Sequence, residues 1–112
     1  MRQLTGAELL LLRDAADAGA EPVLLDVREP WEVALAAIRV DGLATLHMPM
    51  AEVPGRLDEL GASRPIVCIC HHGVRSAQVV AFLEREGLAS VYNLAGGIDS
   101  WSQQIDATVP RY

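Results

Sequence analysis

The sequence contains no lysine: its nine basic residues are all arginines, and fifteen acidic residues give the chain a formal net charge of −6. Proteins that bind nucleic acid or anionic membranes present stripes or patches of basic side chains. Because this chain is acidic and has no basic stripe, we expect it to bind neither. The use of arginine alone, together with sixteen alanines, favours a GC-rich and therefore bacterial source.

Long hydrophobic runs and a cysteine framework are also absent. The longest purely aliphatic stretch covers residues 9–12, far short of the ~18 residues of a membrane span. Two cysteines, Cys68 and Cys70, are too few for a disulfide-stapled scaffold. The N-terminus lacks the basic start, apolar core and cleavage site of a secretory signal, so the sequence predicts a cytoplasmic protein.

The chain does contain enough apolar material for one folded domain. Its 112 residues, 51% of them hydrophobic, match a single domain with one core, which we expect to span residues 1–112. Short apolar runs predict strands near 2–4, 23–27, 44–48, 66–70 and 91–94, and the segments between them predict helices near 5–18, 31–37, 52–60, 76–86 and 98–104. This alternation predicts an α/β fold with a mostly parallel central sheet flanked by helices on both faces.

Two local patterns indicate where helices begin. Thr5-Gly6-Ala7-Glu8 is a capping box, with Thr5 as N-cap and Glu8 three positions later. Gly19 suits the C-terminal cap of the same helix. Pro30 stands where the first turn of the next helix tolerates proline.

The segment after the strand at 66–70 carries the chemistry. Binding sites in parallel sheets form beyond the carboxyl ends of strands, where Cys70 lies, followed by a loop and a helix N-terminus. A cysteine is nucleophilic as its thiolate, which a helix N-terminus favours; consecutive loop N–H groups can hold an anion, and glycine allows the backbone a close approach. We therefore predict an anion-binding cup with Cys70 as the nucleophile at its base. The cup is formed by His71, His72, Gly73, Val74, Arg75 and Ser76.

Arg75 stands at an unfavourable place for a cation. A positive charge near a helix N-terminus opposes the helix macrodipole by roughly 0.3–1 kcal/mol, so we expect a negative partner. That partner is either a bound anion, which a guanidinium can grip with two hydrogen bonds, or a carboxylate of the chain: Asp26, Glu29 or Glu32. The two hypotheses are compatible.

The other polar residues near Cys70 have more than one interpretation. His71 and His72, at the rim of the cup, either assist anion binding when protonated or are water-exposed spacers. Ser76 donates to the loop or caps the helix. Asp26, which ends its strand, is expected to support the site by anchoring loop N–H groups or an arginine.

Several nearby residues are interpreted as structural. Cys68 is expected to be a small buried core residue, Arg28 and Glu32 to form an ion pair four residues apart, and Trp31 and Trp101 to be packing residues. The two cysteines and two histidines within residues 68–72 are too crowded for one tetrahedral ion, whose ligands usually come as separated pairs. No metal site is predicted.

Three segments, in order along the chain, form recognisable motifs. They are Asp26-Val27-Arg28-Glu29-Pro30-Trp31-Glu32, then Cys70-His71-His72-Gly73-Val74-Arg75-Ser76, then Leu94-Ala95-Gly96-Gly97-Ile98 with Trp101. They resemble the first signature, the active-site loop and the C-terminal signature of single-domain rhodaneses, the thiosulfate-type sulfurtransferases. The resemblance covers about residues 4–111 and identifies a single rhodanese-like domain. In one departure, residues 36–43 replace the family's Gly-His-Ile-Pro-Gly-Ala segment, which alters a loop and no sulfur-handling residue.

The resemblance implies a covalent mechanism. Cys70 would attack the outer sulfur of thiosulfate or a similar donor, release sulfite, and hold the sulfur as a persulfide until a thiol, or cyanide in an assay, removes it. No metal or organic cofactor is implied. A non-enzymatic sulfur carrier acting on a protein partner would use the same persulfide, so that hypothesis stays open.

A phosphatase or arsenate reductase is a third hypothesis, since both can use a cysteine, a backbone cup and an arginine. In that type of cup five residues separate the cysteine from the arginine, whereas four separate Cys70 from Arg75. The smaller cup suits a single sulfur atom better than a phosphoryl group.

Overall fold

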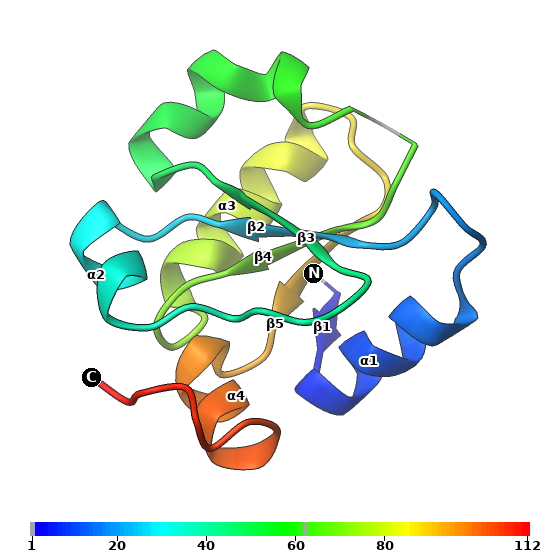
Figure 1. Cartoon of the computed structure of the whole chain (residues 1–112). Helices are drawn as coiled ribbons and strands as arrows, with labels where there is room; N and C mark the ends of the chain where they lie inside the picture. The colour runs from blue at the N-terminus through cyan, green and yellow to red at the C-terminus, as the bar shows by residue number, and fades with distance from the viewer. Residues whose placement is uncertain (1, 62) are drawn as a thin grey trace.

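The sheet is built from five short strands. A computed structural model describes residues 2–61 and 63–112. It contains β1 (Gln3–Leu4), β2 (Val23–Asp26), β3 (Ala44–His47), β4 (Ile66–Ile69) and β5 (Val91–Leu94), in the order β1-β5-β4-β2-β3. All the neighbouring pairs run parallel (Figure 1). The predicted parallel α/β fold is therefore confirmed, and the carboxyl ends of the strands lie at one edge.

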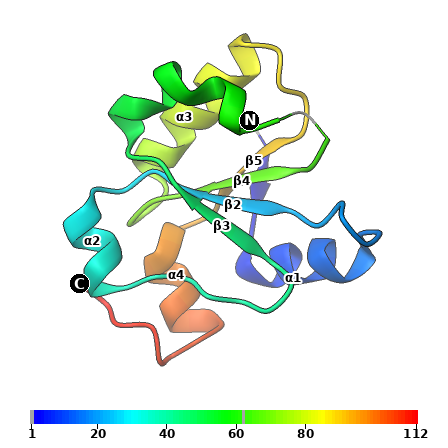
Figure 2. The same cartoon turned by 45° about the horizontal axis from the view of Figure 1, so that its top comes forward.

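Helices cover both faces of this sheet. They are α1 (Gly6–Ala15), α2 (Pro30–Leu35), the 3-10 helix η1 (Met50–Glu59), α3 (Val74–Arg85) and α4 (Gly97–Gln104). Figures 1 and 2 show α1 and α4 on one face and α3 with η1 on the other, while α2 follows the carboxyl end of β2. Within residues 2–61 and 63–112, no helix is long and apolar enough to cross a membrane.

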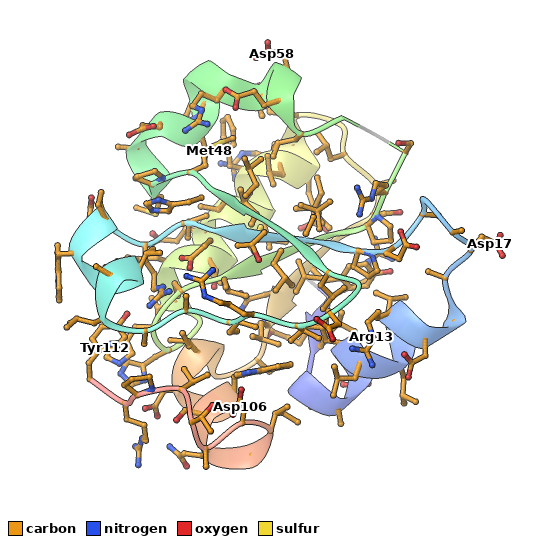
Figure 3. The ribbon with its side chains drawn as sticks, in the orientation of Figure 1. Arg13, Asp17, Met48, Asp58, Asp106 and Tyr112 are labelled. Carbon is orange, nitrogen blue, oxygen red and sulfur yellow. The ribbon has the colours of Figure 1, made fainter. Side chains whose placement is uncertain are left out.

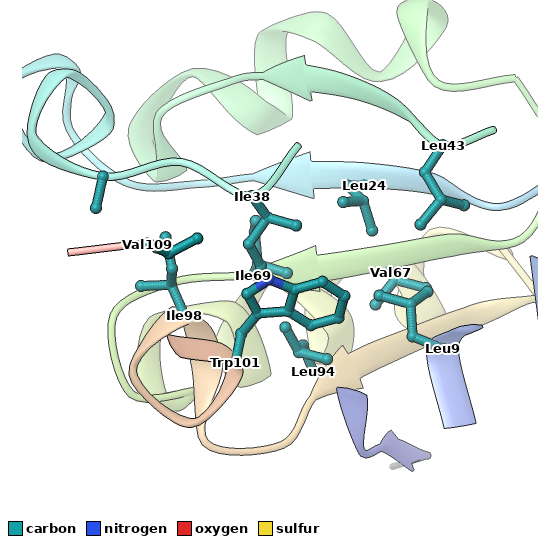
Figure 4. Close-up of a cluster of buried hydrophobic side chains, with 11 residues drawn as sticks. Leu9, Leu24, Ile38, Leu43, Val67, Ile69, Leu94, Ile98, Trp101 and Val109 are labelled. Carbon is teal, nitrogen blue, oxygen red and sulfur yellow. The ribbon is translucent and has the colours of Figure 1, made fainter. Parts of the chain in front are cut away.

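Alternate side chains of the strands enter two separate cores. On the face covered by α1 and α4, Val67 and Ile69 belong to a buried apolar cluster with Trp101 (Figure 4). On the opposite face, Cys68 belongs to a second cluster with Leu83. Because both faces are covered, every residue of β4 is buried, which explains the uninterrupted apolar run in the sequence. The predicted core roles of Cys68 and Trp101 are confirmed.

The N-terminal capping box is present, but the helix that it opens is shorter than predicted. Thr5 Oγ1 accepts a hydrogen bond from the Glu8 N–H at 3.1 Å, and the Glu8 carboxylate accepts one from the Thr5 N–H at 2.9 Å. α1 ends at Ala15 rather than near residue 18, because the backbone at Ala16 is extended. Gly19, which we expected to cap this helix, adopts a φ of +84° further along the chain.

Two further helices differ from the prediction, one in its helix type and the other in its first residue. η1 is a 3-10 helix with Pro54 inside it and a non-helical backbone at Arg56, since proline cannot donate the backbone hydrogen bond of an α-helix. α3 begins at Val74, two residues before its predicted start at Ser76. The first turn of α3 therefore includes part of the predicted cup.

Candidate active site

Cys70 is the first residue after β4, at the edge where the parallel strands end. The residue is 1% exposed. The end of β2 lies beside it, because Asp26 is paired in register with Ile69. The structure thus brings the two strand ends that carry predicted site residues next to each other, as expected for a parallel sheet.

The Cys70 sulfur accepts hydrogen bonds from three donors of the loop and of α3. The Gly73 N–H lies 3.0 Å from Sγ, the Ser76 N–H 3.4 Å, and the Ser76 hydroxyl 3.2 Å. Gly73 is the N-cap of α3 and has a φ of +97°, a conformation that favours glycine. N–H groups at a helix start lack partners within the helix, and here they point at the sulfur. Of the residues predicted to form the cup, Gly73 and Ser76 donate to Sγ, and these donors are placed to stabilise negative charge on the sulfur.

A buried asparagine braces this cup from the neighbouring strand. Asn93, in β5, accepts a hydrogen bond from the Ser76 hydroxyl at 2.5 Å and donates one to the Gly73 carbonyl at 3.0 Å. The acceptors of the Ser76 hydroxyl are thus the Cys70 sulfur, at the base of the predicted cup, and Asn93 of the neighbouring strand. Because a hydroxyl has one proton, Ser76 donates to either Asn93 or the Cys70 sulfur at a given moment. Sequence reasoning missed Asn93, whose signal was a polar residue inside the otherwise hydrophobic strand 91–94.

The N-terminus of α4 holds the loop from its other side. The Ile98 N–H donates to the Cys70 carbonyl at 2.9 Å, and the Asp99 N–H to the His71 carbonyl at 3.1 Å. Gly97 has a φ of +61°, and a Cβ there would lie 2.5 Å from both carbonyl oxygens. Only glycine allows this close approach, which explains why the second residue of the Gly96-Gly97 pair is a glycine.

Arg75 is bound to Glu32 by two hydrogen bonds. Nη1 lies 2.6 Å from Oε1 and Nη2 lies 2.8 Å from Oε2. The Arg75 guanidinium lowers the pKa of the buried Glu32 to about 2, and Glu32 in turn raises the pKa of Arg75, to which the nearby Cys70 also contributes. The hypothesis that Arg75 pairs with a carboxylate of the chain is confirmed, and Glu32 is that carboxylate.

Asp26 anchors a different arginine. Arg28 is fully buried; its Nε donates to Asp26 Oδ1 at 2.9 Å and its Nη2 to Oδ2 at 2.7 Å, while the Arg28 N–H also donates to Oδ1. Asp26 therefore has the supporting role that we predicted. The predicted ion pair of Arg28 with Glu32 is wrong. Arg28 donates to the backbone carbonyl of Glu32 and not to its carboxylate, because Arg75 binds the carboxylate.

Tyr112 joins these two ion pairs to the cysteine loop. Its hydroxyl donates to Glu32 Oε2 at 2.7 Å and accepts from Arg28 Nη1 at 3.0 Å, and its ring stacks on His71 with centroids 3.9 Å apart. Figure 3 shows Tyr112 beside α2. Sequence reasoning did not find this residue, since nothing local to 105–112 indicates a contact with α2.

Trp31 corrects another prediction. We expected it to pack, but it is 62% exposed, and its ring meets the Tyr112 ring edge-on at 6.2 Å. The reason is its place in α2, which lies at the end of the sheet rather than over one face. Val74 of the loop is also exposed, so its side chain takes no part in the cup.

The two loop histidines differ in their surroundings. The His71 ring lies between Tyr112 and His72, at 3.9 Å from each, and burial lowers the pKa of His71, which favours its neutral form. The side chain of His72 is exposed, with Nδ1 3.9 Å from Asp99. Burial also raises the pKa of Cys68 to about 12, so Cys68 remains a thiol.

His71, His72 and Asp99 offer ligand atoms within 4.8 Å of one another. The imidazoles are stacked, however, with 28° between their planes, and lone pairs in nearly parallel planes do not converge on one ion. Asp99 is also paired with Arg111 at 3.0 Å. These three residues therefore do not present the converged ligand set that a transition metal needs.

Known proteins are similar to this chain in both sequence and fold. The Rhodanese-like domain family matches residues 7–104. A sulfurtransferase of Allochromatium vinosum is 39% identical over 87 residues, which cover 77% of this chain and 78% of that protein. The crystal structure of a rhodanese-like domain protein from Staphylococcus aureus is 27% identical, with a TM-score of 0.76 over 100% of this chain and 99% of that one.

Other relatives are longer. The rhodanese-like/PpiC domain-containing protein 12 of Arabidopsis thaliana, a chloroplastic protein, is 34% identical over 92 residues, which make up 82% of this chain and 31% of the plant protein. This chain thus corresponds to less than a third of that relative. Its fold, its cysteine loop and these matches agree: the chain belongs to the rhodanese-like domain family, whose named members include sulfurtransferases.

Proposed function

We propose that the protein transfers sulfane sulfur through a persulfide on Cys70. The observation that carries the proposal is the convergence of three donors on one buried sulfur: two backbone N–H groups and the Ser76 hydroxyl. Such a donor set stabilises a thiolate before the reaction and the negative charge of a persulfide after it. Cys68, two residues earlier, is a buried thiol and serves as the internal reference.

The reaction has two half-steps. The Cys70 thiolate attacks the outer sulfur of a donor such as thiosulfate; the new bond joins Sγ to that sulfur, and the donor's own bond breaks with its electron pair leaving on sulfite. A thiol or cyanide then attacks the outer sulfur of the persulfide, the sulfur–sulfur bond breaks, and the Cys70 thiolate is restored. This is ping-pong covalent catalysis, and both half-steps conserve electrons without a cofactor.

Two versions of this function differ only in the acceptor. An enzyme passes the sulfur to a small thiol or to cyanide in repeated turnovers, whereas a carrier passes it to a protein partner. The same donors hold the persulfide in both. We favour the enzyme, because a relative of which this chain covers 78% is named a sulfurtransferase.

The intact mass of the protein after incubation with a sulfane-sulfur donor tests the proposal. We expect a gain of one sulfur atom on the wild type and on Cys68→Ser, and none on Cys70→Ser. Loss of that sulfur when cyanide or a thiol is added, followed by multiple turnovers, identifies the enzyme. A wild-type mass that never increases, combined with turnover of an aryl phosphate, would replace this proposal with the phosphatase hypothesis.

A further inference from the structure

We propose that Tyr112 is a positioning residue for sulfur transfer. Its hydroxyl orients the Arg75 side chain through Glu32, and its ring holds the cysteine loop in place through His71. The inference rests on the proposed function, because it concerns how fast Cys70 is loaded with sulfur. The two contacts come from opposite parts of one side chain, so they can be removed separately.

The segment that carries Tyr112 is anchored before it reaches the site. Val109 is buried in the apolar cluster under α1 and α4, and its carbonyl accepts a hydrogen bond from the Ser102 hydroxyl at 2.5 Å. Arg111 Nε donates to Asp99 Oδ1 at 3.0 Å. Figures 1 and 3 show this segment running from α4 to α2, where Tyr112 lies. The phenol therefore meets its partners from a backbone that is tied to the core.

The Tyr112 hydroxyl lies between two charged side chains. It accepts a hydrogen bond from Arg28 Nη1 at 3.0 Å and donates one to Glu32 Oε2 at 2.7 Å. A phenolic hydroxyl has one proton to donate and lone pairs to accept, so it satisfies both neighbours at once. Because Arg28 is wholly buried, its position is set by the core. The hydroxyl thus connects a fixed guanidinium to the Glu32 carboxylate and orients that carboxylate.

Glu32 passes this constraint on to Arg75. Its two carboxylate oxygens accept from Nη1 and Nη2 at 2.6 and 2.8 Å, which uses two of the five N–H hydrogens of the guanidinium. The Arg75 side chain is 34% exposed, so part of the cation remains open to a ligand. Glu32 raises the pKa of Arg75, and Cys70 contributes to the same shift, which places the cation within electrostatic reach of the sulfur. The carboxylate therefore sets how the open part of Arg75 is directed beside Cys70.

The Tyr112 ring acts on the cysteine loop directly. It stacks on the His71 imidazole with centroids 3.9 Å apart and 6° between the ring planes. The His71 carbonyl accepts a hydrogen bond from the Asp99 N–H at 3.1 Å, so His71 is held at both its side chain and its backbone. Because His71 follows Cys70 directly in the chain, these contacts restrict the peptide that carries the nucleophile.

Two substitutions separate the hydroxyl from the ring. The readout is the rate constant for persulfidation of Cys70 by thiosulfate, followed by intact mass on samples shown to be folded by circular dichroism. Tyr112→Phe, which keeps the ring, should lower this rate constant about fivefold, the size of one hydrogen bond. Tyr112→Leu, which removes both contacts, should lower it at least about tenfold, towards the ~100-fold that a displacement of about 1 Å can cost.

Tyr92 provides the matched control. Its hydroxyl accepts a hydrogen bond from Arg2 at 3.2 Å, and its half-buried ring packs against the same apolar cluster as Val109. Tyr92→Phe and Tyr92→Leu therefore remove the same groups from another part of the molecule. Both variants should keep the rate constant within about twofold of the wild type.

A double-mutant cycle tests the path through Glu32. In the Glu32→Gln background, Tyr112→Phe should change the rate constant less than about twofold, because the carboxylate through which the hydroxyl acts is gone. Residues that act through each other give non-additive effects. A tyrosine that only stabilised the fold would lower the free energy of unfolding and leave the rate constant of folded samples unchanged.

The ring protons of His71 give a readout that does not depend on activity. Protons stacked on an aromatic face are shielded, so Tyr112→Leu should move the His71 resonances downfield in the proton NMR spectrum. Tyr112→Phe should leave them in place while it slows loading. The spectrum of His71→Gln assigns these resonances among the three histidines of the chain.

The outcomes separate the two proposals. Absence of persulfidation in the wild type would contradict the proposed function itself. Rapid loading of the wild type, with the same rate constant in Tyr112→Phe and Tyr112→Leu, would overturn the positioning role and leave the Cys70 persulfide standing. An equal loss for Tyr112→Phe with and without Glu32 would overturn the path through Glu32. If Tyr112→Leu does not fold, Tyr112→Phe and its cycle with Glu32→Gln still decide the role of the hydroxyl.

Discussion

Cys68 and Cys70 lie two residues apart and belong to the same buried cluster, so burial and residue type do not distinguish them. Cys68 lies within β4, where burial raises the pKa of its thiol to about 12. Cys70 lies one residue beyond the strand, where the start of α3 directs two N–H groups at its sulfur. What separates the two sulfurs is that the end of a strand meets the start of a helix at Cys70, and the reactivity that we propose for Cys70 depends on this arrangement.

The largest effect should come from exchanging the sulfur itself. Cys70→Ser should reduce sulfur turnover to cyanide at least about 1,000-fold, because a hydroxyl is not ionised at neutral pH and cannot carry a sulfane sulfur. Cys68→Ser is the matched control and should retain turnover within a few-fold. Steady-state rates measured on folded samples test this prediction. Comparable losses of turnover in both variants would contradict the different roles of the two cysteines.

Gly97→Ala should disturb Cys70 while leaving Cys68 in its core. A Cβ at this position would lie 2.5 Å from the Cys70 and His71 carbonyl oxygens, so the loop must shift, and a shift of about 1 Å can cost ~100-fold in rate. Gly55→Ala, whose Cβ would meet nothing within 4 Å, is the control. Turnover and circular dichroism of both variants test this, and full activity in Gly97→Ala would contradict it.

Acid should weaken the ion pair beside Cys70. The pKa of Glu32 is lowered from 4.5 to about 2 by Arg75, so its contribution to stability is complete above about pH 5 and is lost as the pH falls towards 2. This shift of the Glu32 pKa corresponds to a contribution on the order of 3 kcal/mol to the free energy of unfolding. Urea unfolding of the wild type and of Glu32→Gln at several pH values measures this contribution. The difference between their free energies of unfolding should disappear in acid, and a difference that does not change with pH would count against the ion pair.

Ser76→Ala should have a smaller effect. It removes the hydroxyl from the Cys70 sulfur and from Asn93 but keeps the backbone N–H donors. Loss of one hydrogen bond of this kind corresponds to a decrease of about tenfold in turnover. Ser102→Ala, which removes a buried hydroxyl bonded to Val109, is the control, and an equal loss of turnover in both would mean that the Ser76 hydroxyl acts only on stability.

Cys68→Ala should have the smallest effect on chemistry. It removes one small buried side chain and should lower the free energy of unfolding by about 1 kcal/mol without changing turnover. Denaturant titration and steady-state kinetics on the same sample provide the two numbers. A stable but inactive Cys68→Ala would show that the inner thiol takes part in sulfur transfer.

Local sequence patterns predicted much of this architecture. The apolar run at 66–70, the glycine after it and the following helix were sufficient to place Cys70 at the carboxyl edge of a parallel sheet, since each signal involves neighbours in the chain. The capping box at Thr5 and Glu8 was predictable for the same reason. The helix end at Ala15 was not, because Gly19 offered an equally plausible local cap.

The parts of the site that sequence reasoning missed depend on distant contacts. Tyr112 lies 80 residues from Glu32 along the chain, and Asn93 lies 17 residues from Ser76. The sequence predicted three possible carboxylate partners for Arg75 but did not distinguish among them. The choice follows from packing: the Asp26 carboxylate is taken by Arg28, Glu29 is exposed, and the buried Glu32 receives Arg75.

The hydrogen of the Ser76 hydroxyl can change its hydrogen-bond acceptor without the movement of any heavy atom. Its oxygen lies 2.5 Å from Asn93 Oδ1 and 3.2 Å from the Cys70 sulfur, so rotation about one C–O bond exchanges the acceptor of a single proton. Such a rotor reorients quickly compared with any loop motion. As charge on the sulfur appears and disappears through the proposed sulfur-transfer cycle, the local dipole can follow it, and the energy of reorganisation is confined to one hydrogen atom.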